Sequence, residues 1–285
     1  QSRGRRKPGE VEMGGEGHYW VEIIATGDEI MLGRIVDTNS SWVAKRIAEL
    51  GARLRRITCV GDNLEEISGA VRESLARENN LLILTGGLGP SEDDLTVEGL
   101  AKALGRSVKI SEEARMMLLK KCEELGLELT PRRERMARVV EGGRPLPNRI
   151  GMAPVIKVEE GATTIIALPG VPEEMKASFE DHVAPIIRAK THKSLVARSI
   201  QLRMVWKEFF PLLDLLREHY PKAYFKPAAT PPLRMDEREM EREIKMDIAV
   251  EAPSKEAGEA LMEELLRELD ERLRGLGGRI LRAAS

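Results

Sequence analysis

The 285-residue sequence is poor in the residue types that build several common kinds of site. It has two cysteines, Cys59 and Cys122, and neither has a cysteine or histidine partner at the spacing of a zinc site. Its four histidines are scattered singly, which disfavours a site built on a nucleophile paired with a histidine base. Sparse cysteine is typical of a reduced compartment, so we expect a cytoplasmic protein.

Long apolar runs and an excess of one charge are also missing. The longest apolar runs, such as IIALPGV at 165–171, are far shorter than the roughly 20 residues that a membrane span needs. Forty-five basic residues against 47 acidic ones leave a net charge of −2, so no overall field attracts nucleic acid. We therefore expect neither a membrane nor nucleic acid as a partner, and any anion site must be local.

Amide side chains are scarce as well. The chain has two glutamines and five asparagines, whereas 32% of its residues are charged. Few thermolabile amides and many ion pairs are typical of thermophilic proteins, so we expect a thermophilic source.

The first two thirds of the sequence alternate strand patterns with helix patterns. Apolar runs at 19–26, 53–60 and 81–85 are each followed by a helical repeat or a helix-initiating loop, and this order favours a parallel α/β sheet. We expect further helices over 95–105, 111–126 and 172–189, one more opened by Pro131, and strands over 154–158 and 163–168. These elements form one domain over 19–190, after a glycine-rich leader over 1–18 that we expect to be disordered.

Residues 191–285 have a different order and form a second, smaller domain. We expect strands over 195–205, 223–226 and 243–250, helices over 207–219 and 254–274, and a short final strand RILRA. Two strand–helix–strand pieces of this size suggest a small α+β lobe resembling a split βαβ sheet, with an exposed, Pro-rich and charged connection over 227–243. The GLGG at 275–278 matches the GxxG of nucleic-acid-binding KH modules, but its place after the last helix favours a glycine cap.

The stretch LLILTGGLGPSEDDLT at 81–96 carries the clearest chemical signal. A buried strand runs into Gly86, Gly87 and Gly89, whose lack of a side chain would let main-chain N–H groups approach an anion. Carboxylates that follow such a loop can hold Mg²⁺ or orient a water molecule, a role open to Asp93 and Asp94. The alternative is plain capping of the next helix by Ser91, Glu92 and Asp93.

Two further loops follow predicted strands. TGDEI at 26–30 places Asp28 after the first strand, and LPGVPEEM at 168–175 places Gly170 before a helix. Ligands of parallel sheets bind at the carboxyl ends of the strands, so three loops at one edge favour a single shared site.

The segments TGDEIMLGRIVDTNSSWVAKRIAELG, VGDN, ILTGGLGPSEDDLT, PLPNRIGMAP and LPGVPEEM resemble the CinA family, in its form without the amidase domain. The resemblance covers about residues 20–190. It implies a three-layer α/β fold, similar to the molybdopterin-binding domain of molybdenum-cofactor biosynthesis proteins, and a small KH-like or ferredoxin-like lobe. It also implies homo-oligomers, whereas the amidase activity on nicotinamide nucleotides is not carried over. Val140 and Val155 replace the usual Pro and Gly of the family.

The resemblance further implies a small phosphorylated ligand at the GGLGP loop and a metal-dependent ADP-ribose pyrophosphatase activity. Asp94 and Asp28 would be catalytic, and Asp93 and Asp94 would hold a divalent metal such as Mg²⁺. The ligand-binding residues would be Thr85, Gly86, Gly87, Gly89, Ser91, Thr96, Asn39, Asn148 and Gly170. The rival hypothesis is a protein that binds molybdopterin without turning anything over.

Overall fold

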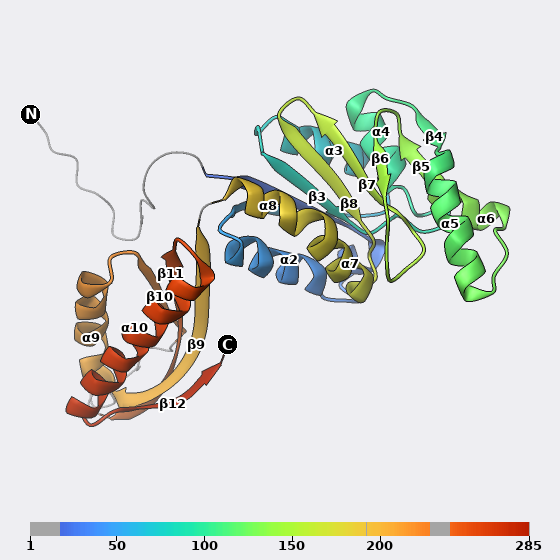
Figure 1. Ribbon diagram of the computed structural model, residues 1–285. Coiled ribbons are helices and arrows are strands. Elements are labelled where there is room, and N and C mark those ends of the chain that lie inside the picture. Colours follow the sequence, from blue (N-terminus) through green and yellow to red (C-terminus); the bar gives the residue numbers. More distant parts are fainter. Residues whose placement is uncertain (1–17, 192, 229–239, 285) are drawn as a thin grey trace, which may run out of the picture. The chain divides into compact units, whose positions relative to one another are not determined.

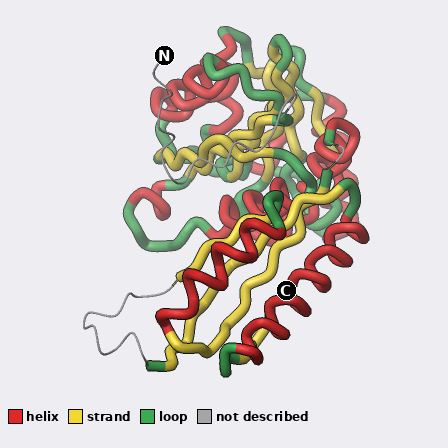
Figure 2. Tube along the Cα trace, turned by 90° about the vertical axis from the view of Figure 1, so that its left-hand side faces the viewer, coloured by secondary structure: helices red, strands yellow, loops and turns green. Residues whose placement is uncertain are grey.

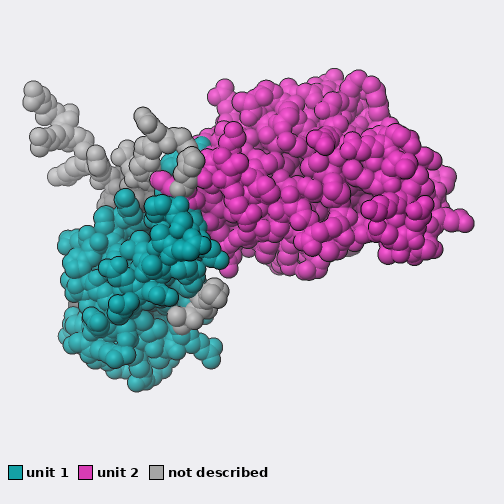
Figure 3. Space-filling model, viewed as in Figure 1, with its two compact units in different colours: residues 1–18, 194–285 teal, residues 19–193 magenta. Residues whose placement is uncertain are grey.

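The computed structural model describes residues 18–191, 193–228 and 240–284 (Figure 1). The chain divides into two compact units, one formed by Tyr19–Lys193 and the other by the residues from Ser194 onward (Figure 3). The predicted leader, apart from His18, and most of the predicted charged connection lie outside the described residues.

A six-stranded sheet forms the centre of the first unit, with the strand order β2-β1-β3-β8-β7-β6. The strands are β1 (Trp20–Thr26), β2 (Arg53–Val60), β3 (Leu81–Thr85), β6 (Arg144–Leu146), β7 (Val155–Glu160) and β8 (Thr163–Leu168). The first four in the order are parallel, whereas β7 and β6 are antiparallel to their neighbours. The prediction of a mostly parallel sheet is therefore confirmed.

Helices cover both faces of this sheet and complete three layers (Figure 1). Side chains on one face of the strands pack against α3 (Leu64–Leu75), α4 (Thr96–Leu104) and α5 (Glu112–Leu125). Those on the other face pack against α2 (Thr38–Glu49), α7 (Pro172–Ser178) and α8 (Ala184–Lys190). All five residues of β3 are buried, as expected for a central strand covered on both faces.

Several short elements differ from the sequence-based expectation. The two-stranded sheet of β4 (Val108–Ile110) and β5 (Arg138–Val140) was not predicted, nor was the four-residue helix α1 (Asp28–Met31). The helix opened by Pro131 exists, but α6 (Pro131–Glu134) spans one turn and leads into the 3₁₀ turn Arg135–Ala137.

The long helix predicted over 172–189 is confirmed in its extent, but it is not a regular α-helix throughout. A π-helical turn at Phe179–Val183 separates α7 from α8. Pro185, in the first turn of α8, has no N–H to donate to the preceding turn, so the regular helical hydrogen bonding is interrupted there.

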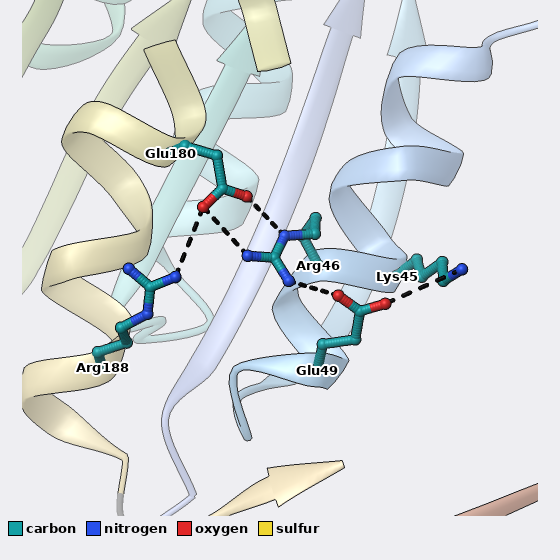
Figure 4. Close-up of polar contacts among 5 residues, drawn as sticks. All are labelled: Lys45, Arg46, Glu49, Glu180 and Arg188. Atoms are coloured by element: carbon teal, nitrogen blue, oxygen red, sulfur yellow. Dashed lines mark hydrogen bonds and ion pairs between the residues drawn. The ribbon is translucent and has the colours of Figure 1, made fainter. Parts of the chain in front are cut away.

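An ion-pair network fastens this interrupted helix to α2 (Figure 4). Glu180, in the π-helical turn, accepts from Arg46 Nε at 2.6 Å and from Arg46 Nη2 at 3.0 Å. Arg188 of α8 lies 3.5 Å from the same carboxylate, and Arg46 also pairs with Glu49. The network therefore links α2 to the π-helical turn and to α8.

The second unit contains β9 (Ser194–Val205), α9 (Trp206–His219), β10 (Ala223–Ala228), β11 (Glu241–Ala252), α10 (Lys255–Gly275) and β12 (Arg279–Ala284). Its antiparallel sheet has the order β10-β11-β9-β12. Both helices pack against one face of the sheet, where they share a single core (Figure 2). This βαββαβ arrangement is ferredoxin-like, which decides between the two topologies expected for the small lobe.

The GLGG segment is a helix cap, as the sequence favours. Gly277 has a φ of 76°, in the left-handed region. Its N–H donates to Arg274 O at 3.1 Å, and that of Gly278 donates to Leu273 O at 2.7 Å. These two bonds make the Schellman ending that commonly closes a helix.

Candidate functional site

A cavity of about 880 Å³ lies at the carboxyl ends of the parallel strands of the first unit. Its walls come from the loops that follow β1, β2, β3 and β8, together with the start of α2 and α7. The segments 125–136 and 151–153 contribute a further wall. Ligands of open α/β sheets bind at this edge, so the cavity is the candidate site.

The glycine loop after β3 is shaped by the protein's own packing. Gly86 and Gly87 have φ values of 98° and 63°, which other residues rarely adopt. A Cβ on Gly87 would lie 2.3 Å from Thr96 Oγ1, and one on Gly86 would lie 2.5 Å from Thr26 O. The loop can therefore lie this close to β1 and α4 only with glycine at both positions.

Thr96, at the start of α4, holds the glycine loop through a hydrogen bond. Its hydroxyl donates to Gly86 O at 2.8 Å and lies 3.1 Å from Thr26 Oγ1. Thr26 in turn donates to Thr85 O at 3.3 Å, and both threonines are buried. Thr96 does not line the cavity, whereas Thr26, to which the sequence assigned no role, does.

The carboxylate of Asp94 lines the cavity and also closes the loop. It accepts the Ser91 main-chain N–H at 2.7 Å, and a Cβ on Gly89 would lie 2.6 Å from its Oδ2. Helix α4 begins after Leu95 without a side-chain cap, so Ser91, Glu92 and Asp93 do not cap it. The alternative of plain helix capping is therefore wrong.

Asp28 and Asp62, which follow β1 and β2, form a reciprocal pair of hydrogen bonds. The N–H of Asp28 donates to the Asp62 carboxylate at 3.1 Å, and the N–H of Asp62 donates to Asp28 Oδ1 at 3.1 Å. Only Asp62 lines the cavity. Burial raises the pKa of Asp62, and the negative charges of Asp28, Glu29 and Asp94 raise it further.

Asp62 is a residue that sequence reasoning missed. It belongs to the VGDN segment, which contributed to the family resemblance but received no role. Its place directly after β2, at the same edge as the other loops, is the signal that could have found it.

Asn39, at the start of α2, and Gly170, in the loop after β8, meet in the wall of the cavity. Asn39 Nδ2 donates to Gly170 O at 2.7 Å, and a Cβ on Gly170 would lie 3.2 Å from Gly86 Cα. The Oδ1 atom of Asn39 is buried without a hydrogen-bond partner. This acceptor is available to a ligand donor, because a buried polar atom left unpaired costs free energy.

Asn148 holds residues of the cavity wall in place through hydrogen bonds. Its Nδ2 donates to Ala153 O at 3.0 Å and to Glu174 Oε2 at 2.9 Å, and its Oδ1 accepts the Gly151 N–H at 2.9 Å. These bonds fix the loop that supplies one wall, but the side chain of Asn148 is not part of the lining.

The structure thus brings most of the predicted site residues to one cavity. Those that line it are Asn39, Thr85, Gly86, Gly87, Gly89, Ser91, Asp93, Asp94 and Gly170. Asp28, Thr96 and Asn148 do not line it, although each bonds to a residue of the wall or of the glycine loop.

The described residues contain no group of three or more histidine, cysteine, aspartate or glutamate side chains placed to hold a metal. The carboxylates that line the cavity are of the type that Mg²⁺ prefers, and Mg²⁺ is often held by one or two of them together with ligand phosphates. A divalent metal therefore stays a prediction.

Over the described ranges of both units, no helix is long and apolar enough to cross a membrane.

Comparison with known proteins assigns the α/β unit to a family. The model of the probable molybdopterin-binding domain matches residues 22–189, which include every loop around the cavity. The chain belongs to this family. As a molybdopterin-binding-domain protein it is similar to CinA of Thermoplasma acidophilum, with 37% identity and a TM-score of 0.55 over 59% of this chain and 98% of that one. The predicted CinA-like fold is confirmed.

Relatives of similar length occur in thermophilic archaea. A protein of Sulfolobus acidocaldarius is 37% identical over 265 residues, which are 92% of this chain and 98% of the relative. A protein of Pyrobaculum aerophilum is 36% identical over 251 residues, which are 84% of this chain and 89% of the relative. Both alignments extend beyond the α/β unit into the small lobe.

Proposed function

We propose that this CinA-like protein hydrolyses a nucleoside diphosphate-sugar such as ADP-ribose, giving AMP and ribose 5-phosphate. The observation that carries the proposal is that Asp62 and Asp94, from the loops after β2 and β3, line the same cavity as the glycine loop. The negative charge of Asp94 contributes to the raised pKa of Asp62, after burial of that carboxyl and the charges of Asp28 and Glu29. A cavity of about 880 Å³ is of a size that ligand sites commonly have.

The chemistry required is the addition of water across a P–O–P bond. The water oxygen bonds to one phosphorus, and the bridging oxygen leaves with the other phosphate. One proton of the water is taken by a base, and the other stays on the phosphate that the water forms. We assign the acceptance of a water proton to Asp94, and the holding of the diphosphate to main-chain N–H groups of the glycine loop. Asp28 is a positioning residue in this account, because its carboxylate binds the main chain of Asp62.

A divalent ion such as Mg²⁺ would bind to carboxylates of Asp94 and Asp93 together with the ligand phosphates. When bound, it would neutralise the charge that develops on the phosphate oxygens.

The experiment is a hydrolysis assay of the full chain with ADP-ribose and Mg²⁺ or Mn²⁺, with AMP and ribose 5-phosphate measured as products. Asp94→Asn keeps an oxygen that can accept the Ser91 N–H, so we expect a folded variant whose turnover falls by about 100-fold or more. Its affinity for ADP-ribose should change less than its rate. Glu92→Gln is the matched control, because Glu92 is exposed in the same loop and does not line the cavity.

A non-catalytic molybdopterin-binding protein is the second candidate, and the family match favours it. A parent protein that binds molybdopterin but cleaves no ADP-ribose with any of several divalent metals would decide for this candidate.

The cytoplasmic location and the homo-oligomer stay predictions. Light scattering of the purified chain would test the oligomer.

A further inference from the structure

The walls of the cavity carry an unbalanced set of charges. Six carboxylates line it, whereas Arg133 is the single basic side chain among the described lining residues. The carboxylates are those of Glu29, Asp37, Asp62, Asp93, Asp94 and Glu174. A phosphate entering this cavity would be repelled by most of the wall.

These carboxylates are not neutralised by the protein. Across the part of the chain that the structure describes, none of the six forms an ion pair with a lysine or arginine. Asp37, Asp62 and Asp94 accept main-chain N–H groups, and Glu174 accepts the amide of Asn148. No ion pair in the described part of the chain therefore offsets these carboxylates.

Arg133 also lacks an ionic partner within the described residues. Its side chain makes one hydrogen bond, from Nη1 to Glu128 O at 2.7 Å. Three other partly buried arginines of this unit are paired with carboxylates: Arg46 with Glu180, Arg115 with Glu134 and Arg138 with Glu98. Arg135, which is also partly buried, bonds to Ser91 O instead and does not line the cavity. In the ranges that the structure describes, no carboxylate therefore pairs with the positive charge that Arg133 brings to the cavity wall.

The local structure holds Arg133 beside the glycine loop. Its N–H donates to Thr130 Oγ1 at 3.3 Å, which caps α6. The neighbouring arginines reach the same loop, since Arg132 Nη2 donates to Ser91 Oγ at 3.3 Å and Arg135 Nη2 donates to Ser91 O at 3.2 Å. Segment 131–135 therefore lies against Ser91, and Arg133 lines the cavity on this side.

We propose that Arg133 binds the phosphate group of the ligand and makes the site select phosphorylated ligands over their unphosphorylated counterparts. A guanidinium has five N–H donors and matches the geometry of a phosphate, and one bond to Glu128 leaves most of these donors free. The acidic remainder of the wall accepts hydrogen bonds from hydroxyl or amino groups of the ligand. The proposal rests on the proposed function only in requiring a phosphorylated ligand.

The test measures calorimetric binding of inorganic pyrophosphate to the full chain. We expect the parent to bind it and Arg133→Gln to bind it at least about 10-fold more weakly, a difference of about 1.4 kcal/mol. Arg133→Lys keeps the charge and should recover part of the loss. Arg144→Gln is the charge-matched control, because Arg144 is exposed on β6 and does not line the cavity.

A second measurement compares AMP with adenosine. The parent should prefer AMP, and Arg133→Gln should lose this preference with little change in adenosine affinity. Arg133→Met is a second charge-removing variant, and thermal unfolding checks that each variant is folded.

Pyrophosphate binding by Arg133→Gln equal to that of the parent would overturn the proposal. So would a parent that binds no pyrophosphate and does not distinguish AMP from adenosine. A parent that binds pyrophosphate through Arg133 but cleaves no ADP-ribose would instead support this inference and contradict the hydrolase.

Discussion

The small lobe and the cavity of the α/β unit differ in how their charged side chains are neutralised. In the small lobe, Arg203 pairs with Glu243 across two strands, and Arg198 pairs with Glu259 of α10. Around the cavity, Arg133 and the lining carboxylates have no such partner among the described residues. Paired charges are consistent with a structural role, whereas unpaired charges that converge on a cavity favour ligand binding.

The largest effect on stability is expected in the core of the small lobe. Leu265 of α10 is fully buried, so Leu265→Ala should lower the free energy of unfolding of this unit by about 2–5 kcal/mol. Thermal unfolding measures the loss, and Glu264→Ala at an exposed position of the same helix is the control. Activity per folded molecule should stay at the parent level. Loss of activity without loss of stability would give α10 a role in turnover. It would contradict the structural role that the comparison assigns to the small lobe.

A smaller effect is expected from the network between α2 and the π-helical turn (Figure 4). Glu180→Gln weakens two bonds to the partly buried Arg46, so it should cost about 1–2 kcal/mol. Lys45→Ala is the matched control, because Lys45 is 65% exposed and lies 3.9 Å from Glu49. An exposed pair of this kind contributes about 0–1 kcal/mol. Equal losses in urea unfolding of the two variants would show that this network does not fix α2.

The smallest effect on stability is expected at Asp62. Here the substitution should stabilise the protein, whereas the two preceding ones destabilise it. Since the folded-state pKa of Asp62 is raised, the ionised carboxylate destabilises the folded state. This penalty is absent below 3.8, the usual pKa of an aspartate, and develops as the pH rises through the raised pKa of Asp62. Asp62→Asn should therefore be slightly more stable than the parent at neutral pH, and the gain should vanish in acid. Thermal unfolding across this pH range checks it, and a variant less stable than the parent at neutral pH would contradict it.

Much of the fold could be predicted because its elements carry local patterns. The buried run of β3 and the helices that end at Gly105 and Gly126, both left-handed caps with a φ of 64°, are visible in the sequence. The three-residue strands β4, β5 and β6 are not, because they are too short to show a period and depend on pairing with distant segments. The π-helical turn at Phe179–Val183 was not part of the prediction of a long helix over 172–189.

The site could be predicted only in part, for a related reason. The glycine loop is a local motif, so its residues were found together. Whether the side chains of Thr96 and Asn148 face the cavity depends on tertiary packing. Both bond to the wall or to the glycine loop without lining the cavity. The unpaired state of Arg133 is visible only when its neighbours in space are known.

Amide hydrogen exchange of the full chain, with and without ADP-ribose and a divalent metal, tests most directly whether the unpaired charges mark the binding site. Bound ligand stabilises the segments that it contacts. The account predicts slower exchange in residues 85–94 and 131–136, and unchanged exchange in 194–228 and 240–284. Slower exchange confined to the small lobe, or no change in the two cavity segments at saturating ligand, would contradict it.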